Sequence, residues 1–128
     1  MNTMDINRAD VLAEVTAAFE RYELALVGND VTALDALFWD SPHTIRYGVG
    51  ENLYGFAAIQ AFRAARPAVG LARRILRTQI TTYGDNAATT HIEFQRDGSP
   101  RIGRQTQTWL KTPGGWRVAS AHVSLMGP

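Results

Sequence analysis

The sequence predicts an α+β fold, with three helices packed on one face of a curved, mostly antiparallel sheet. Two observations support it. Apolar residues recur at helical spacing in the first half of the chain, and from residue 72 onward long strand-like segments alternate with turns rich in Gly, Asn, Asp and Pro. Helices followed by a run of strands are typical of α+β proteins. At 128 residues the chain fits one domain, residues 1–128.

The first helix is indicated by an apolar stripe at steps of four, four, three and four. Its members are Val11, Val15, Phe19, Tyr22 and Leu26. Gly28-Asn29 is a stop signal, and Asp30 is a suitable N-cap for a second short helix. That helix carries Leu34, Leu37 and Phe38. It should end at 40–42, because a residue before proline avoids helical geometry.

A short hairpin and a third helix follow. Residues 43–48, HTIRYG, read as a strand, and 51–54, ENLY, as a second short strand beyond a turn. Gly55 to Arg66 is the third helix, and Pro67 follows it. Its apolar stripe consists of Phe56, Ile59 and Phe62.

The remainder of the chain predicts four long strands. We expect them at residues 72–83, 87–96, 101–111 and 116–126. This order of elements resembles that of the nuclear-transport-factor-2-like (NTF2-like, or SnoaL-like) superfamily, over essentially the whole chain. The resemblance implies a cone with an open mouth. That fold hosts isomerases, dehydratases, hydrolases and binding modules, so it does not specify a function.

Composition excludes several classes of function. The formal net charge of +1 gives no field that would favour nucleic acid or an anionic membrane. The absence of cysteine removes disulfides, thiolate metal sites and cysteine nucleophiles. The N-terminal MNTMDINRAD is polar and unlike a signal peptide, and no apolar run approaches a membrane span. We expect a cytoplasmic protein without a cofactor.

The three histidines, His43, His91 and His122, lack a local metal-ligand spacing. They could converge from different strands on zinc, or each could be a hydrogen-bonded residue of the sheet, with His122 the best candidate for a structural role. His91 and Glu93 share a strand face. They could form an acid–base pair or an inter-strand or dimer contact.

The strand 101–111 is polar on both faces. Gln105, Gln107 and Trp109 alternate along one face, opposite Arg104, Thr106 and Thr108. Either one face lines a wet cavity and the other meets a partner subunit, or this is an edge strand exposed to solvent. By analogy with the superfamily, we place Gln105, Gln107 and Trp109 toward the cavity.

Tyr22 lies on the apolar stripe of the first helix, so its hydroxyl is directed inward. It is either a core tyrosine bonded to a backbone carbonyl or part of a site. The segment RYELALVGND and the strand that follows resemble the ketosteroid isomerases of the same fold, which place a catalytic tyrosine here. In that resemblance the position of their carboxylate base falls on Arg46. An arginine cannot abstract a proton from carbon, so the reversed charge argues against steroid isomerisation.

Arg46 stands between Ile45 and Tyr47 in an otherwise core-like strand. Simple alternation would place Ile45 and Tyr47 on the core side and Arg46 outside. The superfamily pattern instead directs Arg46 into the cavity. A buried guanidinium needs an anionic partner, and in such a cavity a substrate carboxylate would serve.

Five segments together resemble the AtzH-like family: FWDSPHTIRYG, ENLYG, ITTYG, GRQTQTW and GWRVASAHVSLM. They are spread from the first third of the chain to its C-terminus, and they are specific as a set. The resemblance implies a decarboxylating amidohydrolase of cyanuric acid degradation that converts 1,3-dicarboxyurea to allophanate without a metal. The family's catalytic candidates fall on Tyr22 and Arg46.

The remaining expectations concern binding and partners. Gln105, Gln107, Trp109, Phe38 and Arg63 are the candidates for binding the small dicarboxylate. Arg63 and Arg66 could supply charge for its second carboxylate, or both could be solvated helix arginines. A homodimer or higher homo-oligomer should form through the outer face of the last strands, and pathway neighbours would include the amidase that makes the substrate. The competing interpretations are a non-catalytic anion-binding or oligomerising module, and an isomerase or dehydratase acting on a small acid.

Overall fold

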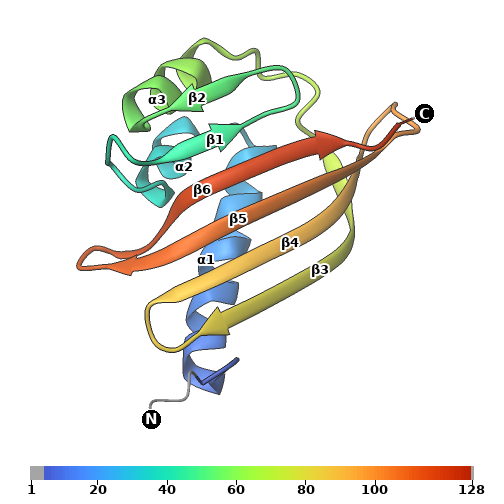
Figure 1. The fold of residues 1–128 in the computed structure, drawn as a ribbon. Coiled ribbons are helices and arrows are strands. Elements are labelled where there is room, and N and C mark those ends of the chain that lie inside the picture. Colours follow the sequence, from blue (N-terminus) through green and yellow to red (C-terminus); the bar gives the residue numbers. More distant parts are fainter. Residues whose placement is uncertain (1–4, 128) are drawn as a thin grey trace.

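The α+β prediction is confirmed: in the described part of the chain, three helices and a mixed, open six-stranded sheet make up the fold (Figure 1). The structure is a computed structural model that describes residues 5–127. Its helices are α1 (Ala9–Val27), α2 (Val31–Leu37) and α3 (Phe56–Ala65). Its strands are β1 (Ile45–Tyr47), β2 (Asn52–Tyr54), β3 (Arg73–Tyr83), β4 (Ala87–Arg96), β5 (Ile102–Thr112) and β6 (Gly115–Leu125).

The sheet has the order β2-β1-β6-β5-β4-β3. Neighbouring strands are antiparallel except for β1 and β6, which run parallel. Figure 1 shows α1 crossing one face of the long strands, with α2 and α3 on the same side beside the β1–β2 hairpin. Because the helices cover one face only, the outer face of the long strands is left open.

The predicted stripe of α1 is fully buried against this sheet. All five of its members are 8% exposed or less, and Val15 is completely covered. From the sheet, Trp109, Phe94 and Val118 meet them with no exposed surface. Burying a large apolar side chain contributes roughly 1.5–3 kcal/mol, so this layer fixes α1 on the sheet.

The second helix, α2, begins where the sequence predicts but ends earlier, at Leu37, so that Phe38 is its extended C-cap and not part of the helix. Asp30 caps α2, its carboxylate accepting the Ala33 backbone N–H at 3.1 Å. In α3 the predicted stripe is only partly right, because Ile59 is buried while Phe56 and Phe62 are half-buried. The third helix spans residues 56–65, inside the predicted limits of 55 and 66.

The strand containing the two glutamines is interior, so the edge-strand interpretation is wrong. β5 lies between β4 and β6 in the sheet, and its residues 105, 107 and 109 point to the covered side, at most 2% exposed. Thr106 and Thr108 are half-buried and Arg104 is exposed on the opposite face. None of the helices among residues 5–127 is long and apolar enough to cross a membrane.

Candidate active site

Tyr22 lies in the C-terminal half of α1, where helical spacing turns it toward the sheet. Its side chain is 4% exposed, and its ring packs against Phe38 with centroids 6.2 Å apart. It also lines a small cavity between α1, the α3–β3 connection and the sheet. The phenol lies near Arg63 and Arg66, whose pKa values are lowered by burial.

Arg46 points inward, against the simple alternation of its strand. In the sheet it stands beside Ala121, which is buried, whereas Ile45 stands beside Ser120 and Tyr47 beside His122, both exposed. Tyr47 and His122 touch edge to face, with ring centroids 5.6 Å apart. Neighbours in register share a face, so Ile45 and Tyr47 lie on the outer face and Arg46 on the covered one.

Two side chains hold the Arg46 guanidinium in place. Its Nη1 donates to Glu51 Oε1 at 2.8 Å, and its Cζ lies 5.4 Å from the centroid of the Phe62 ring. Gly48 makes the ion pair possible, because a Cβ there would lie 1.8 Å from Glu51 Oε1 and 2.9 Å from Arg46 Nη1. The ion pair uses one nitrogen of the fork and leaves the others to bind a ligand.

Arg46 belongs to two adjoining chambers. The inner chamber, of about 40 Å³, is lined by Tyr22, Leu26, Arg46, Arg66, Gly70, Leu71, Arg73, Arg96, Gln105 and Val123. The outer chamber, of about 250 Å³, is lined by Arg46, Val49, Glu51, Phe62, Arg66, Val69, Gly70, Leu71, Arg96 and Val123. One water needs roughly 10–15 Å³ on this measure, so the inner chamber can take a group the size of a carboxylate.

Arginine dominates the walls of both chambers. Arg73, 4% exposed, pairs with Glu23 and donates to Gln105 Oε1 at 3.1 Å. It also stacks on Phe94, with its Cζ 4.4 Å from the ring centroid. Burial lowers the pKa of Arg66 and of Arg96, and the positive charge of Arg46 lowers both further. This cavity is therefore a cationic pocket with an aromatic and aliphatic frame, suited to a small anion.

Of the five residues expected to bind substrate, Gln105 reaches the inner chamber. Its Nε2 is buried and has no hydrogen-bond partner among residues 5–127, which leaves a donor for a ligand. Gln107 and Trp109 lie on the same face but belong to the core. There Thr90 donates to Gln107 Oε1, and Trp109 donates to the Thr90 hydroxyl, each at 3.1 Å. They line neither chamber.

Phe38 and Arg63 also lie outside the two chambers, stacked on each other with 4.2 Å between the guanidinium carbon and the ring centroid. The interpretation of Arg63 as a solvated helix arginine is wrong, because its side chain is 3% exposed and pairs with Asp35 at 3.0 Å. Burial lowers the Arg63 pKa, while Tyr22 and Asp35 oppose the shift. Arg63 is thus held by α2, away from the cavity.

His91 and Glu93 lie exposed on the outer face of β4, so they are not an acid–base pair inside the cavity. With Arg77, Gln79, Arg104 and Thr106 they border a separate depression on that face. His43 is exposed beside Trp39, and His122 is exposed on β6 with its ring against Tyr47. Within the described part of the chain, no cluster of three or more His, Cys, Asp or Glu side chains could hold a metal ion.

Sequence reasoning missed four residues of the site: Glu51, Arg73, Arg96 and Glu23. Glu51 begins the predicted strand ENLY, five residues from Arg46, where a hairpin partner of opposite charge could have been sought. Arg73 and Arg96 stand opposite each other in the β3–β4 register, but nothing in their spacing shows that this end of the sheet meets α1.

The AtzH-like family model matches residues 4–128. The chain belongs to the AtzH-like family. A search of curated proteins finds no match.

Solved structures show the NTF2-like, or cystatin-like, fold of this chain. The chain is similar to a protein of unknown function from the DUF3225 family of Pectobacterium atrosepticum SCRI1043, at 62% identity, 96% coverage of each chain and a TM-score of 0.95. It is similar to a cystatin-like fold protein of Burkholderia xenovorans LB400, at 45% identity over 98% and 99% of the two chains, with a TM-score of 0.93. An NTF2-like superfamily protein of Salmonella enterica serovar Typhimurium LT2 shares 25% identity over 94% of each chain, with a TM-score of 0.77.

Proposed function

We propose that this AtzH-like protein is a decarboxylating amidohydrolase that converts 1,3-dicarboxyurea to allophanate in cyanuric acid degradation. The observation that carries the proposal is the meeting of Tyr22 and Arg46 in one buried cationic chamber. The two residues come from α1 and β1, and they are the positions on which the family's catalytic candidates fall. Membership of the AtzH-like family supports the same reaction.

The reaction needs few catalytic groups. One terminal N–C bond of the substrate breaks, its electron pair stays on the urea nitrogen, and the carboxylate leaves as carbon dioxide. The nitrogen takes up one proton, which leaves allophanate, and hydration turns carbon dioxide into bicarbonate. Because N-carboxy compounds lose carbon dioxide unaided, orientation and a well-placed proton donor would suffice.

Arg46 would orient the substrate. Glu51 and Phe62 fix its guanidinium, so the free part of the fork is already aligned for a carboxylate. Arg46 is mostly buried, with 13% of its side chain exposed, and burying an unpaired cation is unfavourable. Its ion pair with Glu51 reduces this desolvation cost. Gln105 Nε2 would donate a further hydrogen bond to the anion.

Tyr22 would supply the proton to the departing nitrogen. It lines the inner chamber beside Arg46, and its position on a rigid helix keeps the phenol in a fixed direction. The proton would be replaced from water through the outer chamber. A phenol that only orients water would occupy the same place. Removing the hydroxyl distinguishes the two roles, because loss of a proton donor lowers the rate more than loss of a positioning group.

The alternatives predict different behaviour. A non-catalytic module would bind small anions in this cavity and leave the spontaneous decay of 1,3-dicarboxyurea unchanged. An isomerase or dehydratase needs a base at the substrate, and the two candidates from the sequence, His91 and Glu93, face away from the cavity. Of the three, the cavity favours decarboxylation, because that reaction uses an anion clamp and an acid.

The test is direct measurement of carbon dioxide or bicarbonate and allophanate from freshly made 1,3-dicarboxyurea, with the spontaneous rate subtracted. The proposal predicts stoichiometric allophanate at a rate proportional to enzyme, lost in Arg46→Ala. Arg104→Gln, an exposed change on the outer sheet face, is the matched control and should keep the wild-type rate. A protein rate no higher than the spontaneous one would reject the enzyme and favour the binding module.

A further inference from the structure

Arg66 makes no ion pair with another residue of the described range 5–127. It directly follows α3, and its side chain turns into the cavity wall. Its Nε and Nη2 atoms are buried and have no hydrogen-bond partner among residues 5–127. Guanidinium donors in such a place are costly to leave unsatisfied, so this side chain is prepared for a ligand.

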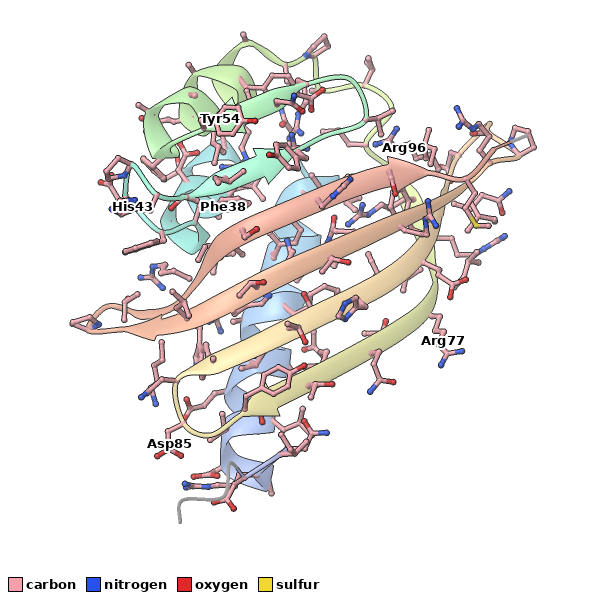
Figure 2. The ribbon with its side chains drawn as sticks, in the orientation of Figure 1. Phe38, His43, Tyr54, Arg77, Asp85 and Arg96 are labelled. Atoms are coloured by element: carbon pink, nitrogen blue, oxygen red, sulfur yellow. The ribbon has the colours of Figure 1, made fainter. Side chains whose placement is uncertain are left out.

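Arg96, at the end of β4, is a second arginine of the cavity wall. Figure 2 shows it at the end of the sheet near the α3–β3 connection. It lines both chambers, and it makes no ion pair with another described residue. Burial lowers its pKa, and the charges of Arg73 and Arg46 lower it further. Without a bound anion, the neighbouring guanidiniums therefore destabilise the charged form of Arg96.

The charges around the cavity add to two positive units. Its walls carry four guanidiniums, those of Arg46, Arg66, Arg73 and Arg96. Glu51 neutralises the first and Glu23 the third. Arg66 and Arg96 remain, and they line both the inner and the outer chamber together with Arg46. A ligand with two negative charges would balance this set, whereas a monoanion would leave one cation unmatched.

We propose that Arg66 and Arg96 form a second carboxylate clamp, which makes the site selective for dianions over monoanions. The inference rests on the proposed function for the identity of the reacting end. Arg46 beside Tyr22 holds the carboxylate that leaves, and Arg66 with Arg96 holds the one that stays.

This clamp would also favour product release. The substrate 1,3-dicarboxyurea is a dianion, and allophanate is a monoanion that keeps one carboxylate. The two negative charges of the substrate are its carboxylates, one held by Arg46 and one by the clamp. Loss of carbon dioxide removes the carboxylate at Arg46. The product therefore binds to a pocket with one unmatched cation, and a new substrate dianion displaces it.

The test measures binding without turnover. Glutarate joins its two carboxylates by the same number of chain atoms as 1,3-dicarboxyurea, and pentanoate has the same chain length with one carboxylate fewer. Calorimetric titration of the wild type should show glutarate bound at least ~10-fold more tightly than pentanoate. Arg66→Gln and Arg96→Gln should each lower the preference for glutarate over pentanoate by about that factor. Arg104→Gln, outside the cavity, should change neither affinity.

Thermal unfolding tests whether a variant loses glutarate affinity because its fold is damaged. Because Arg66→Gln removes a charge that has no ion-pair partner among residues 5–127, its melting temperature should equal or exceed that of the wild type. Equal affinity of the wild type for both acids, or loss of both affinities in step in the two variants, would overturn the clamp. Selective glutarate binding without turnover of 1,3-dicarboxyurea would retain the clamp and reject the proposed reaction. Turnover of 1,3-dicarboxyurea without selectivity for the dianion would retain the proposed reaction and reject the clamp.

Discussion

Replacing Tyr22 by phenylalanine separates proton donation from positioning. The change removes one hydroxyl from a side chain that is 4% exposed and keeps the ring contact with Phe38. The fold should hold, because loss of a single hydroxyl changes the free energy of unfolding by about 1 kcal/mol. The catalytic effect should be much larger than this if the phenol is the acid.

The expected size follows from the role. General acid catalysis contributes about 100- to 10,000-fold, which corresponds to about 2.7 to 5.4 kcal/mol of barrier. A neutral hydrogen bond that only positions water is worth about 1 kcal/mol, roughly a five-fold effect. The two roles therefore differ by at least one order of magnitude in kcat.

The assay is the initial rate of allophanate formation at saturating 1,3-dicarboxyurea, corrected for spontaneous decarboxylation. Tyr83→Phe is the matched control, since Tyr83 lies on β3, lines neither chamber and shares a hydrogen bond of 2.9 Å with the Thr89 hydroxyl. It should leave kcat unchanged. A folded Tyr22→Phe protein with the wild-type kcat would refute the catalytic role of the phenol, and a loss of only a few-fold would reduce that role to positioning.

Three further predictions test the rest of the site and the assembly. Arg46→Lys should lower kcat/KM nearly as much as Arg46→Ala, because an ammonium cannot hold Glu51 and a carboxylate with one planar fork; substantial activity in the lysine variant would contradict this. The outer sheet face, where His122 and Ser120 are exposed, should pair with a second copy, so sedimentation showing only a monomer at micromolar concentration would be a contrary result. Activity should survive prolonged dialysis against a strong chelator, and a loss that zinc restores would require a metal site.

The elements of the fold could be read from local patterns. The α1 stripe, the Asp30 cap and the Gly-rich turns each depend on the chemistry of a few neighbouring residues, and all three appear where the sequence places them. The inward direction of Tyr22 follows from the same helical period. The placement of Gln105 and Trp109 on the covered face follows from strand alternation, once the helices are known to lie on one side.

The candidate site depended on contacts between distant segments. Arg63 and Arg66 are three residues apart with similar surroundings in sequence, yet Asp35 binds the first and the cavity receives the second. Local alternation also assigned Arg46 to the wrong face, because the register of β1 on β6 sets its direction.

The sequence by itself determined the helices, the strands, the family motifs and the inward-facing phenol, since each is set by short-range periodicity or by residue identity. The tertiary structure alone decided which arginines keep unmatched charge. The guanidiniums of the cavity come from β1, the end of α3, β3 and β4, and their counter-ions come from α1 and the β1–β2 hairpin. Electrostatic balance in a buried pocket is a property of distances of a few ångströms, and chain folding pairs charges that are distant in sequence, such as Glu23 and Arg73, which are 50 residues apart.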